Sequence, residues 1–267
     1  MIDAGIRPPK SGYEYIYITH WHWDHVLGLA SLENKTVCMH RSTIDILEKK
    51  RYGDRILEIL RAGGVELNDF NKNIIKLMEE KYDKLVEGLS KNYVIPLEEC
   101  PHSRAGIIAY LECPGHSIDH VCYIINDFIF VGDTLLPSRR TTIINFKKHR
   151  ESIVKILGYE WKTLYPGHGD PLTRKQTTKI AKKYLIDRCN RLYRVLHYLT
   201  LRQNATVADL VQEVYGRRSD LTSFILIRTL IGYLTELEEA GFIRINKSVS
   251  PWRVELLSIS SSTSSSY

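Results

Sequence analysis

The chain has 267 residues, 43% hydrophobic and 25% charged, with a formal net charge of +6. This composition is typical of a globular protein, and no apolar run approaches the roughly 18 residues needed to cross a bilayer, so we expect a soluble protein with no membrane partner. No signal-peptide pattern follows Met1, so we expect a cytoplasmic protein. The five cysteines form no CxxC pair and are odd in number, which argues against a cysteine-based zinc site and a secreted disulfide framework.

The first two-thirds of the chain alternate β-type runs with helical stretches. Residues 1–172 are therefore expected to form an α/β layered domain. Helical spacing predicts helices beginning at Asp24 and within 41–62 and 69–89, and we interpret residues 41–90 as a helical lid. Strands are predicted at 13–18, 36–39, 106–111, 121–125, 128–131 and 160–165. The turn-forming pair Asn126-Asp127 predicts a hairpin between two of them.

After Pro171 the character of the sequence changes. A long basic helical segment is expected over 173–200, followed by a helix that Thr206 caps and a third helix over 221–240. Two strands, 242–245 and 252–256, follow the helices. Three helices and a hairpin predict a winged-helix module within residues 173–257. The serine-rich residues 258–267 are predicted to be disordered.

Positive charge is concentrated in the C-terminal third. Residues 171–267 hold 15 Lys/Arg and 8 Asp/Glu, a net +7, whereas residues 1–170 hold 22 and 23, a net −1. This asymmetry favours an acidic partner such as nucleic acid, and a solvated basic helix face without a partner is the alternative. We expect the cysteines to be buried small side chains, with a Cys100–Cys113 disulfide as the alternative in a hyperthermophile.

The strongest functional signal is the segment Thr19-His20-Trp21-His22-Trp23-Asp24-His25. In an extended chain His20 and His22 leave on the same side, because strand side chains alternate, so both imidazoles can meet one ion. Asp24 and His25 follow at the turn into a helix and can reach a second ion. Imidazole and carboxylate are the usual nitrogen and oxygen ligands of zinc.

Three further motifs place a ligand-type residue just after a strand. They are Pro114-Gly115-His116, Val131-Gly132-Asp133 and Tyr165-Pro166-Gly167-His168. In each, a glycine lets the backbone turn sharply before the ligand. We therefore predict two Zn²⁺ ions per chain, although a His/Asp site also accepts Mn²⁺ or Fe²⁺.

The succession THxHxDH, GH, GDT and PGHG resembles the metallo-β-lactamase superfamily of hydrolases. The resemblance covers residues 1–172 and implies an αββα sandwich with the site at one edge. It implies that a first metal is bound by His20, His22 and His116, a second by Asp24, His25 and His168, and that Asp133 bridges both. It further implies a dimetal-bridged hydroxide as nucleophile, with Asp24 as the catalytic residue that orients it.

The C-terminal segment and Gly115-His116-Ser117-Ile118-Asp119-His120 resemble endoribonuclease-type members, the β-lactamase-like protein 2 group. This resemblance implies cleavage of single-stranded RNA phosphodiesters. Hydrolysis of a small acyl substrate, a thioester or ester as in glyoxalase II, is the alternative. A non-enzymatic winged-helix regulator is a third hypothesis. The winged helix could also serve only as a lid or a dimerisation module, so a homodimer stays open.

Residues beside these motifs have two interpretations each. Asp119 and His120 either fix the orientation of the ligand imidazoles or form an ordinary loop hydrogen-bond pair. Arg139 and Arg140 could bind a substrate phosphate or carboxylate, or be a solvated pair. The side chains of Trp21 and Trp23 could stack on a base or belong to the core behind the metals.

Overall fold

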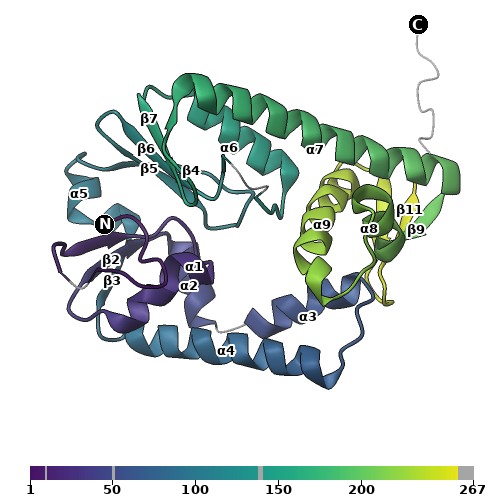
Figure 1. Ribbon diagram of the computed structural model, residues 1–267, viewed down its shortest axis with the longest axis horizontal. Helices are drawn as coiled ribbons and strands as arrows, with labels where there is room; N and C mark the ends of the chain where they lie inside the picture. Colours follow the sequence, from purple (N-terminus) through teal and green to yellow (C-terminus); the bar gives the residue numbers. More distant parts are fainter. Residues whose placement is uncertain (10, 50–51, 138–140, 258–267) are drawn as a thin grey trace, which may run out of the picture. The chain divides into compact units, whose positions relative to one another are not determined.

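The computed structural model describes residues 1–9, 11–49, 52–137 and 141–257 (Figure 1). By their internal contacts they form two compact units. Unit 1 comprises Met1–Ile56 and Leu67–Ile186, and unit 2 comprises Leu57–Glu66 and the residues from Asp187 on. The division differs from the expected 172/173 boundary because helix α7 (Arg174–Arg202) contributes to both units. The serine-rich segment 258–267, expected to be disordered, lies outside the described residues.

Unit 1 contains two β-sheets. The first is parallel, with strand order β1-β2-β3, and the second has the order β4-β5-β6-β7-β8. The strands are β1 (Tyr15–Tyr17), β2 (Thr36–Met39), β3 (Tyr93–Pro96), β4 (Ala109–Glu112), β5 (Val121–Ile125), β6 (Phe128–Gly132), β7 (Thr163–Pro166) and β8 (Leu172–Thr173). Strands β6 and β7 are parallel, whereas the other neighbours in the second sheet are antiparallel.

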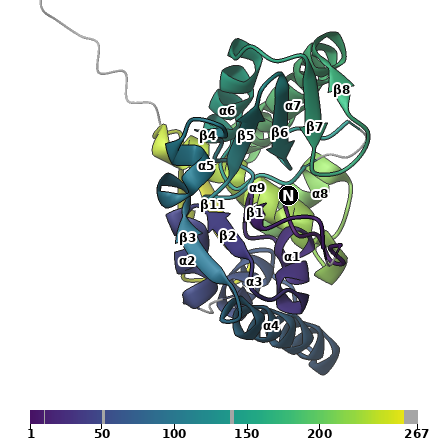
Figure 2. The same cartoon turned by 90° about the vertical axis from the view of Figure 1, so that its left-hand side faces the viewer.

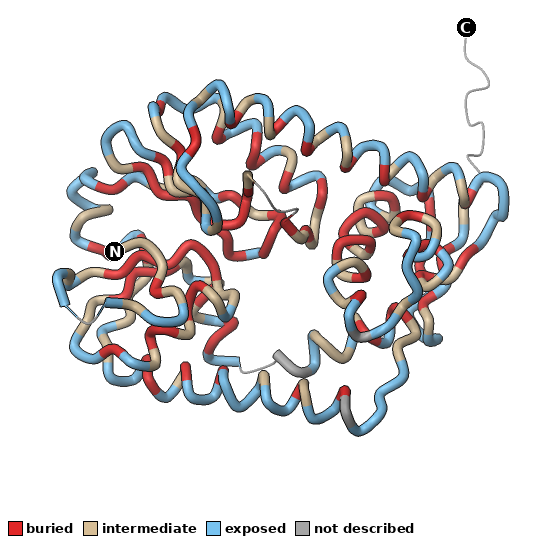
Figure 3. The backbone as a smooth tube through the Cα atoms, viewed as in Figure 1, coloured by how far each residue is buried: buried red, intermediate tan, exposed pale blue. Residues whose placement is uncertain are grey.

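Helices cover the outer face of each sheet. Helices α1 (Trp23–Val26), α2 (Arg41–Glu48) and α4 (Asp69–Leu89), with the 3₁₀ turn η1 (Leu27–Ser31), pack on the first sheet through an apolar cluster that includes Ile16, Met39 and Leu85. Helices α6 (Phe146–Gly158) and α7 pack on the second, where Ile156 and Ile180 meet Ile129. The facing sides of the sheets share a third cluster around Tyr17 and Tyr123. The layers are therefore helix–sheet–sheet–helix, as predicted (Figures 2 and 3).

Several helices and strands in the first two-thirds of the chain differ from the sequence-based expectation. The predicted helical stretch 41–62 is two helices, α2 and α3 (Tyr52–Ala62). Helix α6 was not predicted, because two polar residues, His149 and Ser152, interrupt the apolar pattern of its buried face. Strand β3 was also missed, along with the short elements η2 (Leu97–Glu99) and α5 (Pro101–Arg104).

The disulfide also differs from expectation. Cys100 pairs with Cys38, not with Cys113, which is buried with a free thiol. The reason is the layering: Cys38 and Cys100 belong to the cluster between the sheets, whereas Cys113 faces the opposite side of the second sheet, toward α6.

The described part of unit 2 contains the end of α3, the second half of α7, two further α-helices and an antiparallel sheet of order β10-β11-β9. After α7 come β9 (Asn204–Thr206), α8 (Val207–Tyr215), η3 (Leu221–Ser223), α9 (Phe224–Glu239), β10 (Ile243–Asn246) and β11 (Arg253–Leu256). Thr206 and Asp209 form a capping box that begins α8. No described helix in either unit has the length and apolar character required for a membrane span.

Two arginines of α7 are internal to unit 2. Arg188 is buried, and its guanidinium donates a hydrogen bond of 3.0 Å to the Tyr233 hydroxyl on α9. Arg191 forms a 3.1 Å ion pair with Asp187 and lies over the ring of Tyr215. These basic side chains hold helices together, so they are not part of a solvated basic face.

Candidate metal centre

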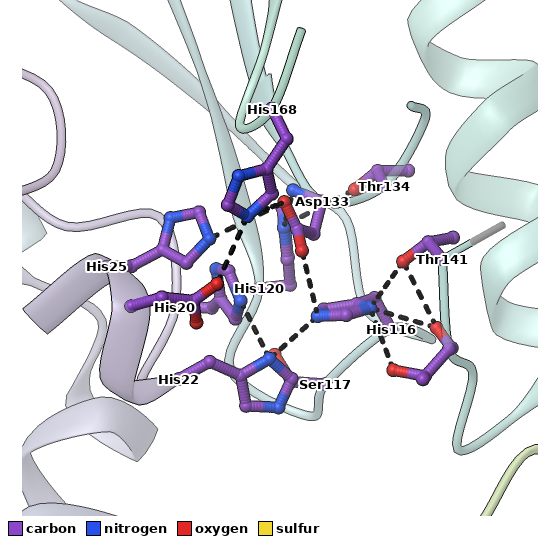
Figure 4. Close-up of polar contacts among 12 residues, drawn as sticks. His20, His22, His25, His116, Ser117, His120, Asp133, Thr134, Thr141 and His168 are labelled. Carbon is purple, nitrogen blue, oxygen red and sulfur yellow. Dashed lines mark hydrogen bonds and ion pairs between the residues drawn. The ribbon is translucent and has the colours of Figure 1, made fainter. Parts of the chain in front are cut away.

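Every segment of unit 1 that carries a predicted ligand follows a strand in the chain. Strands β4, β6 and β7 run in the same direction, so the loops that carry His116, Asp133 and His168 leave from one edge of the second sheet. The His20–His25 segment leaves β1 and enters α1. The structure brings all seven side chains, those of His20, His22, Asp24, His25, His116, Asp133 and His168, into one cluster. Figure 4 labels all of them except Asp24.

Three histidines form the first ligand group. The Nδ1 atom of His22 lies 2.9 Å from His20 Nε2 and 2.8 Å from His116 Nε2. The far nitrogens of His20 and His116 face the Thr19 hydroxyl and the Thr142 carbonyl, respectively. Those Nδ1 atoms carry the ring protons, because the Thr19 hydroxyl already donates to Asp3 and a carbonyl can only accept. Both neutral Nε2 atoms therefore point unshared electron pairs inward, as metal ligands do.

The second group consists of Asp24, His25 and His168. His168 Nε2 lies 3.1 Å from Asp24 Oδ2, and the two side chains are the more open part of the cluster, with 31% and 27% exposure. Asp133 faces both groups. Its Oδ1 lies 3.4 Å from His25 Nε2, and its Oδ2 lies 3.9 Å from His116 Nε2. A carboxylate in this position could bridge two ions.

The buried polar atoms test whether this cluster fits a metal. His25 Nε2 and Asp133 Oδ1 are fully buried, yet neither has a hydrogen-bond partner among the described residues. Unsatisfied buried polar atoms are costly, so a pair of them facing each other indicates a group that completes their bonding. Burial alone would lower the pKa of His25, but Asp3 and Asp133 raise it to about 10. The site therefore stabilises positive charge, and nitrogen and carboxylate donors suit a divalent transition metal.

Some residues that form hydrogen bonds to the candidate ligands were not predicted from the sequence. Asp3 accepts from His25 Nδ1 at 2.7 Å and from the amide and hydroxyl of Thr19 at 2.7 and 2.8 Å. Sequence reasoning missed this role, because only the parallel bridge between Ile2 and Tyr17 brings Asp3 beside Thr19. The only local signal was an acidic residue in the Ile2-Asp3-Ala4-Gly5 segment.

A family model for the metallo-beta-lactamase superfamily matches residues 12–168. The chain belongs to this superfamily. That assignment confirms the family resemblance of the sequence motifs. A metallo-beta-lactamase family protein of Thermus thermophilus has the same fold, with a TM-score of 0.67 and 15% identity over 96% of this chain and 89% of that one.

Among curated relatives of this superfamily member are two named beta-lactamase-like protein 2 homolog. The Drosophila melanogaster protein is 23% identical over 91% of this chain and 74% of its own length. The Caenorhabditis elegans protein is 25% identical over 80% of this chain, which spans 61% of that relative. An atrochrysone carboxyl ACP thioesterase of Aspergillus aculeatus is 23% identical over 94% of this chain and 72% of its own length.

Asp119 and His120 lie behind the candidate ligands and are not members of either candidate ligand group. Asp119 is buried and accepts from the Trp21 amide at 2.9 Å and the Thr43 hydroxyl at 2.7 Å, so it fixes the backbone between the candidate ligands His20 and His22. His120 Nε2 accepts from the Asp133 amide at 3.1 Å. Burial lowers the pKa of His120 to about 4, which keeps the ring neutral and able to accept.

The two tryptophans of the HxHxDH segment differ in environment. Trp21 is partly buried and packs against the apolar cluster under the first sheet, near Tyr82. Trp23 is 42% exposed, with Lys81 Nζ over its ring. The first therefore belongs to the core, and only the second is open to a ligand. Arg139 and Arg140, predicted to bind substrate, lie outside the described residues.

An apolar cavity adjoins the second ligand group. Its volume is about 790 Å³, and Asp24, His25 and His168 form one wall. The remaining wall is largely aromatic and aliphatic and includes Tyr17, Ile108, Phe130 and Tyr165. A cavity of this size and character can hold an apolar group of a small molecule.

Proposed function

We propose that the protein is a binuclear metal hydrolase, with Zn²⁺ as the expected ion and Mn²⁺ or Fe²⁺ as alternatives. The observation that carries this proposal is Asp133, which faces both ligand groups while its buried Oδ1 has no hydrogen-bond partner among the described residues. His20, His22 and His116 would hold one ion, and Asp24, His25 and His168 the other, with Asp133 shared.

When bound, a pair of ions supplies Lewis acidity, which lowers the pKa of water toward about 7 and stabilises negative charge on the substrate. The protein's own side chains would supply orientation and proton transfer. Asp24 sits at the open side of the cluster, so its carboxylate can orient an incoming water and return a proton to the leaving group. Asp3, Asp119 and His120 keep the ligands in place through the hydrogen bonds described above.

For the substrate, we propose single-stranded RNA. Support comes from the resemblance of residues 115–120 and of the C-terminal segment to endoribonuclease-type members. The net charge of +7 over residues 171–267 is compatible with a polyanionic substrate, although Arg188 and Arg191 are used inside unit 2.

We infer that unit 2 is a winged helix. Its order of helix, strand, helix, helix and a two-stranded hairpin, with β9 completing an antiparallel sheet, supports this assignment. Its third helix, α9, carries Arg228 against Glu236, Glu238 and Glu239, a net charge of −2. A helix with this negative charge is poorly suited to bind the phosphate backbone of a nucleic acid. A role as a lid or a dimerisation module therefore fits the winged helix better than recognition of a nucleic-acid groove.

Thioester hydrolysis is the second candidate. The apolar cavity beside Asp24 and His168 could hold the acyl chain of a thioester close to the metals. The similarity to fungal proteins named atrochrysone carboxyl ACP thioesterase supports the same reading.

A parallel turnover assay tests both candidates. Labelled single-stranded RNA and an acyl thioester are incubated with the same preparation, whose metal content is measured by mass spectrometry, and with a His22→Ala control. Metal-dependent RNA cleavage that the control lacks supports the proposal, and thioester turnover alone supports the second candidate. Two metals per chain with neither activity would refute both substrates, and a metal-free active protein would refute the metal centre.

A further inference from the structure

The outer helical layer of unit 1 presents a set of lysines. Lys147 and Lys148 lie in the first turn of α6, and Lys175, Lys179, Lys182 and Lys183 lie along α7, and all six are exposed. The α7 lysines have the spacing i, i+4, i+7 and i+8, which places them on one side of that helix. These six residues are called the lysine face below.

The two helices are neighbours, so their lysines share one surface. The Arg174 guanidinium of α7 donates to the Leu157 and Tyr159 carbonyls at the end of α6, both at 2.7 Å. The rings of His149 on α6 and Tyr184 on α7 have centroids 5.5 Å apart. Both helices cover the same side of the second sheet (Figures 1 and 2).

Acidic residues scarcely neutralise this surface. Residues 174–186 contain no Asp or Glu, and α6 contains only Glu151. None of the six lysines forms an ion pair with any residue that the structure describes. Surface lysines are commonly balanced by nearby carboxylates, as Lys72 is by Asp69 on α4. An unbalanced set of six therefore produces a local positive potential that attracts a polyanion.

The start of the lysine face is close in sequence to a segment that contacts the candidate metal centre. The segment before α6 holds the ligand His116: the Thr142 carbonyl accepts from His116 Nδ1 at 2.9 Å, and the Ile144 amide donates to the Gly115 carbonyl at 2.7 Å. Lys147 follows three residues after Ile144. The start of α6, which carries Lys147, is therefore joined directly to the segment that contacts His116.

We propose that the lysine face binds the phosphate backbone of single-stranded RNA next to the metal centre. This inference rests on the proposed RNA substrate and names the surface that recognises it. An anionic membrane is the less suitable partner, because the apolar sides of both helices are packed on the sheet and cannot insert into lipid. From Lys175 to Lys183 the face extends about 12 Å, at 1.5 Å per residue, so it can span successive phosphates.

The test measures binding separately from cleavage. A labelled single-stranded oligoribonucleotide is titrated by fluorescence anisotropy against the full chain carrying Asp24→Asn, with a gel to verify that the RNA stays intact. The comparison adds Lys175→Gln, Lys179→Gln, Lys182→Gln and Lys183→Gln to the same chain. A control instead removes four exposed lysines of equal total charge on or just after α4, namely Lys72, Lys76, Lys84 and Lys91.

Each lysine–phosphate contact adds about −0.7 to the slope of log K against log salt for single strands, so six contacts give about −4. Removing the four α7 lysines should make this slope shallower by about 3 and weaken RNA binding about 10²- to 10³-fold at 0.1 M salt. The control should stay near the parent affinity. Equal weakening by both variants, or a slope that the α7 variant does not change, would overturn the proposal.

Two further readouts separate the alternatives. Sedimentation with phosphatidylcholine–phosphatidylserine vesicles should show no lysine-dependent binding, and such binding without RNA binding would assign the surface to membranes instead. If the lysine face binds RNA but the unmodified chain does not cut it, the surface stands and the RNA-cleavage proposal fails. If RNA is cut while the α7 substitutions leave binding unchanged, the proposed function stands and the lysine face fails. Equal metal content and thermal denaturation verify that each variant is folded.

Discussion

Replacing Gly167 by alanine should disable the metal centre. A Cβ atom at this position would lie 2.4 Å from Asp133 Oδ1 and 2.9 Å from His25 Cε1. Ordinary contacts of a Cβ atom begin near 3.4 Å, so the shared carboxylate or the backbone must move by about 1 Å, whereas metal–ligand distances tolerate only about 0.2 Å. We expect metal affinity to fall by at least about 10²-fold, or about 2.7 kcal/mol.

Gly158→Ala is the matched control, because a Cβ atom there has no neighbour within 4 Å. Both variants are loaded with zinc, and their affinities are compared by competition with a chromogenic chelator, with stoichiometry from mass spectrometry. Gly158→Ala should hold the same metal as the unmodified chain. Two ions bound at unmodified affinity in Gly167→Ala would refute the assignment of Asp133 as a shared ligand.

The remaining predictions concern charge and packing. In the metal-free protein, burial alone would lower the pKa of His25, but Asp3 and Asp133 raise it to about 10. Protonated His25 therefore stabilises the folded state fully below the unfolded pKa of about 6.5, and this stabilisation is lost as pH rises through about 10. The urea midpoint of the metal-free protein should fall over that pH range. A flat midpoint would contradict it. Zinc binding at neutral pH should release a proton from His25, which calorimetry in buffers of different ionisation enthalpy measures. The Asp3→Asn variant should release a smaller fraction of a proton and bind zinc about 10- to 100-fold more weakly. Arg188→Met should destabilise unit 2 by about 1–3 kcal/mol in thermal denaturation, because the buried Tyr233 hydroxyl loses a hydrogen-bond donor. The same substitution should leave the affinity for RNA unchanged. Weaker RNA binding by the folded variant would contradict the internal role of Arg188.

The ligand set could be predicted from the sequence because its signals are local. Alternation along an extended segment places His20 and His22 on one side, and a glycine after a strand marks Gly115-His116 and Gly167-His168. Neighbouring residues alone determine such patterns, so the candidate ligands and an α/β layered domain followed without coordinates, whereas the αββα sandwich was implied by the resemblance to the metallo-β-lactamase superfamily. The seven residues do converge in the structure, whereas their binding of metal is still a prediction.

Long-range pairing was decided only by the tertiary structure. Asp3 contacts His25 because the chain start pairs with β1, and Cys100 meets Cys38 rather than Cys113 because the two faces of a sheet point into different layers. The sequence likewise counted Arg188 as surface charge, although packing against α9 buries it. Composition reports how many charges a segment has, but burial decides which of them a partner can meet, and burial depends on contacts between residues far apart in the chain.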